Sequence, residues 1–207
     1  MNRKDRRKQK QKNVGELPRG TQEEAYITEN RAQAGQIITL CAMIAAYDLF
    51  DTPADAWEQM GDALQKVGAE YKAVALRHGI RAADQWLAQQ TADSMGKYIR
   101  DQWPIPRAAK NDRERLAFDA QRDGINYSLR LFVLCARQFF DWARDTGKMQ
   151  QLLEETRGNY QQFLDEAALG DSYGHALLDR KVREMTGGEE HIGTDYNKQP
   201  IFGKTLY

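Results

Sequence analysis

One apolar run restricts the fold of this 207-residue chain more than any other feature. Within residues 37–50, only Thr39, Tyr47 and Asp48 carry an oxygen or nitrogen atom in the side chain. The run has fourteen residues, whereas a helix needs roughly 20 apolar residues to cross a bilayer. We therefore predict a helix that is buried in the core of the protein. A second apolar run, residues 131–143, follows in the other half of the chain.

The composition favours an all-α protein. Val and Ile are few and the chain has only five prolines, which favours helices over a sheet. A content of 41% apolar and 29% charged residues is ordinary for a soluble globular protein. The length suits one large domain or two small ones, and it is sufficient for a hydrophobic core that requires no cofactor.

Start and stop signals divide the chain into about six helices, which we expect to form a bundle. Thr21 and Glu24 form a capping-box pattern, and Thr52 before Pro53 is a strong start signal for a second helix. Glycines and prolines end the successive helices. The predicted helices are 22–50, 53–78, 81–102, a fourth from a cap at Asn111 to a stop at Gly147 with Gly124 as a candidate kink, a fifth that carries Met149 to Phe163, and 172–185.

Two matches between the halves of the sequence predict an internal duplication into two related three-helix halves, 21–103 and 107–186. A Leu-Cys-Ala triplet is followed by Asp-Thr at the same spacing in Leu40-Cys41-Ala42 with Asp51-Thr52 and in Leu134-Cys135-Ala136 with Asp145-Thr146. The apolar stripe Met60, Leu64, Val67, Tyr71 and Val74 also has the register of Met149, Leu153, Thr156, Tyr160 and Phe163. The alternative is that any two amphipathic helices share such a stripe.

Residues 1–20 lack apolar periodicity and contain Gly15, Pro18 and Gly20, so we predict a disordered N-terminal arm. Its first twelve residues hold seven basic residues against Asp5, and because the net charge of the chain is zero, the remainder is acidic. This charge density suits contact with a nucleic-acid backbone or with an acidic protein. The alternative is a solubilising tail. The candidate nucleic-acid-binding residues are Arg3, Lys4, Arg6, Arg7, Lys8, Lys10 and Lys12.

Two further features predict contacts. The segment 187–207 is irregular but too apolar for a free tail, so we expect it to dock on the helices or on a protein partner. The four tryptophans are assigned to the core, and Trp103, next to Pro104, is the one that we would place at an interface. The oligomeric state is not indicated by the sequence.

Cys41 and Cys135 are the only cysteines, and both lie in apolar runs. Without a CxxC or Cys/His pattern, they predict buried free thiols in a reducing compartment and not a zinc site or a disulfide. The chain opens on charged residues with no apolar segment directly behind them, which predicts that it has no signal peptide. We expect a cytoplasmic protein with no membrane partner.

The sequence favours a binding protein over an enzyme. It contains no Gly-rich phosphate loop, no nucleophile elbow and no HExxH motif. Its three histidines, His78, His175 and His191, form no metal-binding pattern. We therefore predict a non-catalytic interaction protein with no catalytic residue, no metal site and no cofactor, and an enzyme is the alternative.

Two alternatives involve nucleotides. In a nucleotide-binding protein, aromatic rings and guanidinium groups would bracket a base, and the candidates are Tyr71, Arg77, Arg81 and Trp86. An all-α metal-dependent nucleotide hydrolase would use acidic clusters on adjacent helices. The carboxylates that could belong to such a cluster, Asp48, Asp51, Asp141 and Asp145, are sparse. Asp51 and Asp145 are more simply explained as turn or capping residues.

The opening residues, Met-Asn-Arg-Lys-Asp-Arg-Arg-Lys, resemble the start of small proteins encoded by bacteriophages of Gram-positive hosts. Residues 40–71, an apolar helix, a tight turn and an amphipathic helix, are similar to the helical hairpin of those proteins. The matches cover about a quarter of the chain, which departs from its small relatives by carrying two such hairpins. The resemblance implies no activity. It implies a viral accessory role in the host cytoplasm, such as host takeover, counter-defence or nucleic-acid handling.

Overall fold

The computed structural model describes residues 21–53, 55–95, 103 and 107–188. Nearly all of them are helical and none is in a β-strand, which confirms the predicted all-α class for this part of the chain. Six helices of eleven residues or more dominate the described residues, with one short helix and one 3₁₀ turn between them. The elements are α2 (Thr21–Phe50), α3 (Ala56–His78), α4 (Ile80–Gln90), α5 (Ala92–Met95), α6 (Asp112–Phe139), η1 (Asp141–Arg144), α7 (Thr146–Leu169) and α8 (Asp171–Met185).

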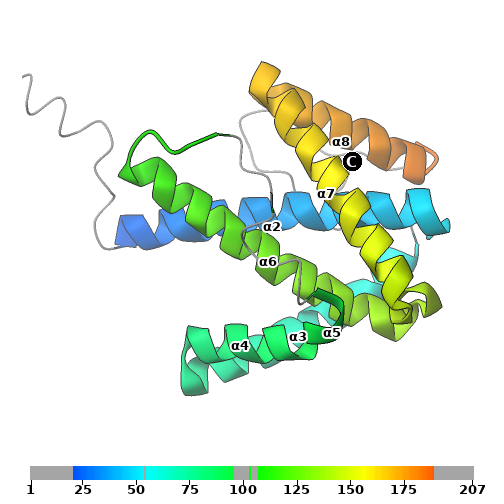
Figure 1. Cartoon of the computed structure of the whole chain (residues 1–207), viewed down its shortest axis with the longest axis horizontal. Helices are drawn as coiled ribbons and strands as arrows, with labels where there is room; N and C mark the ends of the chain where they lie inside the picture. Colours follow the sequence, from blue (N-terminus) through cyan, green and yellow to red (C-terminus); the bar gives the residue numbers. More distant parts are fainter. Residues whose placement is uncertain (1–20, 54, 96–102, 104–106, 189–207) are drawn as a thin grey trace, which may run out of the picture.

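The two longest helices, α2 and α6, cross near the middle of the molecule (Figure 1). The remaining long helices form two hairpins, α3 with α4 and α7 with α8. The α3–α4 hairpin lies below the crossing in Figure 1 and packs on α6. The α7–α8 hairpin packs on α2: its turn and α8 lie above α2 in Figure 1, and α7 runs across α2 toward the lower right. Each hairpin therefore covers the long helix of the other half of the chain.

The apolar run 37–50 is confirmed as the centre of the core. Ile37, Ile38, Leu40, Cys41 and Ile44 are each at most 5% exposed. In the part of the chain that the structure describes, α2 is also the one helix that is long and apolar enough to cross a membrane. However, 56% of its most apolar window is buried inside the fold, as in the core helix of a soluble protein. One continuous core contains residues from both predicted halves.

Gly124 on α6 allows the two central helices to come into backbone contact. A Cβ atom at this position would lie 2.9 Å from the carbonyl carbon of Arg31 on α2 and would collide with the carbonyl oxygen. Gly35 on α2 faces the same crossing, where a Cβ atom would meet the hydroxyl of Ser128. The sequence predicts a kink at Gly124, but α6 continues through it as one helix. The glycine is required by the close approach.

The α6 N-terminus is formed as predicted. The side chain of Asn111 accepts a hydrogen bond of 2.9 Å from the backbone N–H of Glu114. The carboxylate of Glu114 in turn binds the guanidinium of Arg107 through two contacts of 2.6 Å. This bond, together with one from the backbone N–H of Lys110, lowers the pKa of Glu114 to about 2. The start of the second half of the chain is thus specified by side chains close in sequence.

Two helix boundaries differ from the sequence-based predictions. The helix predicted for 81–102 ends as α4 at Gln90. Thr91 leaves the helical conformation with a φ of −117°, and α5 follows as a separate turn. The helix predicted from Pro53 starts at Ala56. Thr52 does not cap it, since this residue is 3% exposed and its hydroxyl has no hydrogen-bond partner among the described residues.

The predictions for Gly147 and Trp103 are also wrong. The fourth helix ends at Phe139 and not at Gly147, which lies in the first turn of α7. The carboxylate of Asp145 caps that turn by accepting a hydrogen bond of 2.9 Å from the N–H of Lys148. Trp103 is 5% exposed and meets the ring of Tyr160 edge to face, so it belongs to the core and not to an exposed interface.

The internal duplication stays a prediction. The two matched stripes lie on the inner faces of α3 and α7, and each of these helices packs on the long helix of the other half. The Cys-to-Thr match does not correspond to equivalent places, however. Cys41 lies nine residues before the end of α2, whereas Cys135 lies four residues before the end of α6.

Several predicted segments lie outside the described residues. These are the basic arm 1–20, most of the joint between the predicted halves, and the C-terminal segment from 189 to 207. The predictions for them therefore stand as they were derived from the sequence.

Replacing Gly124 by alanine should destabilise the protein, because the added methyl group meets backbone atoms of α2 that no side-chain rotation can move. Overpacking of this kind costs roughly 1–3 kcal/mol, which exceeds the gain of about 1 kcal/mol that alanine brings over glycine inside a helix. Gly158→Ala on α7 is the matched control, since its Cβ atom would meet nothing within 4 Å. It should raise the melting temperature. Thermal unfolding followed by circular dichroism compares the two, and equal stability would contradict the backbone contact.

Cys41 and Cys135 are buried and free, as predicted. Burial raises the pKa of the Cys41 thiol far above its usual range and that of Cys135 to about 12. Because the thiolate is the reactive form, both thiols should react slowly with an aromatic disulfide reagent at neutral pH and rapidly once the chain is unfolded in denaturant. Rapid labelling of the native protein would show that α2 and α6 are not core helices.

Candidate functional site

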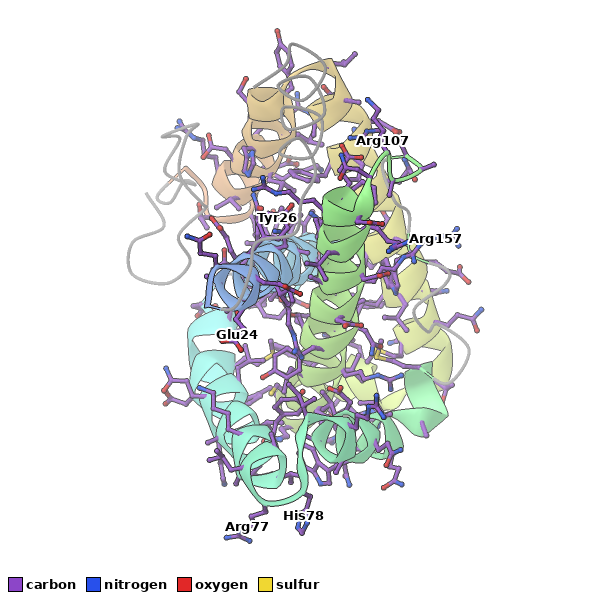
Figure 2. All side chains as sticks on the ribbon, turned by 90° about the vertical axis from the view of Figure 1, so that its left-hand side faces the viewer. Glu24, Tyr26, Arg77, His78, Arg107 and Arg157 are labelled. Carbon is purple, nitrogen blue, oxygen red and sulfur yellow. The ribbon has the colours of Figure 1, made fainter. Side chains whose placement is uncertain are left out.

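The α3–α4 hairpin turns through a single glycine. Gly79 links His78 to Ile80 with a φ of 87°, which residues other than glycine rarely adopt. Its N–H donates to the carbonyl of Ala75 at 2.9 Å and ends α3. Because α4 starts with the next residue, both helices reach the turn, which projects from the lower end of the molecule in Figure 2. We call Lys72 and residues 76–81 the basic tip.

A polar network from four helices holds this hairpin in place. The hydroxyl of Tyr71 on α3 donates to the carboxylate of Asp84 on α4 at 2.6 Å and accepts from Arg31 on α2 at 3.3 Å. The guanidinium of Arg31 also lies 5.1 Å from the ring centroid of Tyr127 on α6. The rings of Tyr71 and Tyr127 meet edge to face with centroids 4.7 Å apart. The network therefore joins the hairpin to both central helices.

The protonation of Tyr71 determines what this network can do. Burial, followed by the hydrogen bond to Asp84, raises the pKa of Tyr71 to about 12. The phenol therefore keeps its proton at neutral pH and acts as a hydrogen-bond donor. A general base or nucleophile would need the opposite shift, toward the working pH.

Arg130 on α6 secures the other end of α4. It is 2% exposed, and its Nε donates to the amide oxygen of Asn126 at 3.0 Å. Its Nη1 donates to the hydroxyl of Thr91 and, at 3.4 Å, to the carbonyl of Ala88. These acceptors are neutral, but two of them lie at the C-terminal end of α4, where the helix dipole favours a cation. Burial lowers the pKa of Arg130, yet an arginine keeps its charge in proteins.

The basic tip combines free cations with exposed apolar side chains. Leu76 is 89% exposed and Ile80 is 55% exposed. Residues 72–83 contain no Asp or Glu. The cations of the tip, Lys72, Arg77 and Arg81, form no ion pair within the described part of the chain. The tip can therefore attract an anionic partner and pack two aliphatic side chains against it.

The candidate nucleotide-binding residues divide between two environments. Arg77 and Arg81 are exposed on the basic tip, and Figure 2 shows Arg77 pointing away from the body beside His78. Tyr71 is 6% exposed, and Trp86 is partly buried against the core. Within the described residues, no hydrogen bond or ring contact joins Tyr71 to the other three. The seven candidate residues of the arm lie outside the described residues.

Three of the four aspartates considered as metal ligands bind other groups, and the fourth lies in a turn. Asp145 caps α7, Asp141 binds Arg144 at 3.0 Å, Asp48 binds Lys181 at 3.6 Å, and Asp51 lies in the turn after α2 with a φ of 50°. In the part of the chain that the structure describes, no three His, Cys, Asp or Glu side chains are grouped so that they could hold a metal ion.

Sequence reasoning missed the residues that hold the hairpin. Arg130 could have been found, because residues 129–136 are apolar on every side of a helix apart from this arginine, which must then be buried with them. Arg31, Asp84 and Tyr127 give no local signal, because their contact depends on how four helices come together.

Tyr71→Phe should lower the free energy of unfolding by roughly 1 kcal/mol, because it removes one hydroxyl that bonds to two charged side chains. Tyr127→Phe is the control, since the hydroxyl of Tyr127 makes no hydrogen bond with any described residue and its ring contacts survive. Urea denaturation of both variants, and of Tyr71→Phe combined with Asp84→Ala, measures the coupling. Equal effects of the two tyrosine substitutions, or additive effects of Tyr71→Phe and Asp84→Ala, would contradict the network.

Comparison with known proteins gives no match to a protein-family model, to a curated protein or to a solved structure. The resemblance to bacteriophage-encoded helical proteins therefore stays a prediction that rests on the opening residues and on residues 40–71.

Proposed function

We propose that this chain is a non-catalytic binding protein whose basic N-terminal arm contacts nucleic acid. The distribution of charge is the observation that carries the proposal. Residues 1–12 contain seven basic residues and one acidic residue, whereas residues 21–95 contain eleven acidic and five basic residues. A polyanion is therefore attracted to the arm, whereas the net negative charge of the first half of the helical body repels it outside the basic tip.

Ion pairs on the helical body also support the assignment of nucleic-acid contact to the arm and not to the body. Most of the ion pairs join residues three, four or seven positions apart: Arg107 with Glu114, Arg115 with Asp112, Arg122 with Asp119, Arg144 with Asp141, Lys181 with Glu184 and Arg183 with Asp179. Paired cations are less available to phosphates than the arm, which carries one acidic residue among its first twelve. Nucleic-acid handling is also one of the accessory roles that the resemblance to bacteriophage proteins implies.

The polar contacts between helices support a scaffold role for the body. Tyr71 and Asp84 join α3 to α4, and Arg130 joins α6 to the end of α4. The phenol of Tyr71 is held in its protonated form by burial and by the Asp84 carboxylate, which raise its pKa. These groups stabilise the positions of helices, as expected for a protein that acts by presenting surfaces to a partner.

Removal of residues 1–12 should abolish binding to DNA or RNA and leave the melting temperature nearly unchanged, because the first described helix begins only at Thr21. The affinity of the full chain should fall steeply with salt, since each neutralised phosphate contributes roughly 0.7 to 0.9 to the slope of log affinity against log salt. Fluorescence anisotropy with a labelled oligonucleotide measures both quantities.

A matched control keeps the length of the arm and removes its charge by replacing the seven basic residues with glutamine. This variant should bind as weakly as the truncated chain. If the truncated chain still binds, the site is on the helical body and the proposal is wrong. If the full chain fails to bind at moderate salt, the arm serves an acidic protein partner or solubility.

A further inference from the structure

Large exposed apolar side chains gather at the two hairpin turns. Six such side chains occur in the described residues, and four of them lie at these turns. Leu76 and Ile80 belong to the basic tip, while Leu169 and Tyr173, which are 75% and 56% exposed, flank the turn between α7 and α8. Clusters of exposed apolar side chains mark contact surfaces more often than single ones do.

The α7–α8 turn carries the opposite charge, and we call residues 165–173 the acidic tip. Residues 164–176 contain Asp165, Glu166 and Asp171 and no Lys or Arg. The carboxylate of Asp165 accepts a hydrogen bond of 2.8 Å from the neutral amide of Gln161. Neither Asp165 nor Glu166 forms an ion pair with a described residue. The acidic tip therefore combines unpaired charges with exposed apolar side chains, as the basic tip does, but its charge is negative.

The two tips lie at opposite ends of the molecule. The basic tip is at the bottom and the acidic tip at the top in both views (Figures 1 and 2). Each turn passes through one glycine, Gly79 or Gly170. On α8, a Cβ atom at Gly174 would lie 2.9 Å from the backbone oxygen of Phe163, so α8 packs directly on α7. The tips are therefore held firmly and cannot meet within one chain.

The local helices account for some of these charges but not for all of them, since Arg77 lies in the last turn of α3, where a cation is favoured. Arg81 lies in the first turn of α4, and Glu166 lies in the last turn of α7. A helix dipole favours anions at its N-terminus and cations at its C-terminus, by about 0.3–1 kcal/mol each. Arg81 and Glu166 both have the sign that their own helix disfavours. For these two side chains, the helix dipole gives no reason for the charge, which is consistent with a contact outside the chain.

We propose that the protein assembles head to tail, with the basic tip of one copy docked on the acidic tip of the next. Arg77 and Arg81 face the carboxylates of Asp165 and Glu166 across this contact. Leu76 and Ile80 pack against the exposed side chains beside those carboxylates. The inference goes beyond nucleic-acid binding and does not depend on it.

The geometry determines the kind of assembly. Because the two surfaces differ, the contact is heterologous and builds rings or open chains, not a two-fold dimer. Two helical turns bury less area than the roughly 1,600 Å² of a standard interface. The association is therefore weak and reversible, and it weakens as salt screens the charges over about 10 Å at 0.1 M.

Sedimentation velocity of the full chain at low salt tests this proposal. The weight-average sedimentation coefficient should rise with protein concentration past the value of a dimer and return to the monomer value at high salt. Arg77→Glu with Arg81→Glu makes both tips acidic, and Asp165→Lys with Glu166→Lys makes both tips basic. Each double variant alone should stay monomeric. An equimolar mixture should associate again, because the basic tips of one variant meet the acidic tips of the other.

Three controls separate the tips from general charge effects. Lys66→Glu with Arg157→Glu changes the charge equally at exposed positions away from the tips, and should keep the concentration dependence of the wild type (Arg157 is labelled in Figure 2). The chain with seven glutamines in the arm should also keep it. Leu76→Ser with Ile80→Ser should lower the association without lowering the melting temperature, since both side chains are exposed.

Three outcomes would overturn the proposal. One is a wild-type chain that sediments as a monomer at every concentration. Another is a mixture of the two folded charge-reversed variants that fails to associate. The third is weaker nucleic-acid binding by Arg77→Glu with Arg81→Glu and unchanged sedimentation, which would make the basic tip a nucleic-acid surface. If a charge-reversed variant does not fold, the double variant Leu76→Ser with Ile80→Ser tests the proposal instead. Unchanged association of this variant would exclude the contact between the tips.

Discussion

The backbone contact between α2 and α6 is the constraint on which the remaining packing depends. Gly124 lets α6 reach the carbonyl of Arg31, and this close approach brings the apolar segments of both helices together. Dispersion contacts fall off steeply with distance, so a small separation of the helices would weaken many of them at once. Residues 37–46 and 129–136 are apolar on nearly every side. They need cover on the faces that the crossing leaves open, and the two hairpins provide it.

Apolar stripes alone would let a hairpin slide along the helix that it covers. We interpret the polar contacts as the groups that specify its position, because hydrogen bonds are directional and these are partly buried between the helices. Arg130 binds the end of α4, and the Tyr71 network binds its first half. On the other hairpin, Asn159 donates to the carbonyl of Cys41 at 3.4 Å, and Lys181 binds Asp48 at 3.6 Å.

Features that depend on neighbours in sequence were the ones that the sequence predicted well. The Asn111 cap, the apolar run 37–50 and the stripes of α3 and α7 each follow from a local pattern. No local pattern predicts the break at Thr91, because the guanidinium that donates a hydrogen bond to its hydroxyl comes from Arg130 on α6. The sequence predicts a kink at Gly124 for the same reason, because the close approach of Arg31 that requires a residue without a side chain exists only where α2 crosses α6.

The residues of the candidate site likewise depend on tertiary packing that local sequence patterns do not predict. Arg77 and Arg81 are predicted from the sequence as nucleotide-binding residues because they lie near Tyr71 and Trp86. Tertiary packing, however, decides which aromatic rings share a surface with them. Tyr71 turns inward to Asp84 and Arg31, so the two arginines are left with Leu76 and Ile80 on an exposed turn. No periodic pattern distinguishes an aliphatic side chain at such a turn from one in the core.

The exchange of hairpins between the halves makes the positions of the two tips depend on each other. The basic tip belongs to a hairpin held on α6, and the acidic tip belongs to one held on α2. The contact between Asn159 and Cys41 joins residues 118 positions apart, so neither half completes its own core. The direction of one tip relative to the other is therefore set by the crossing of α2 and α6 and not by a linker. A fixed direction is also what decides whether repeated head-to-tail contacts close into a ring or continue as an open chain, because closure requires that successive rotations add up to a full turn.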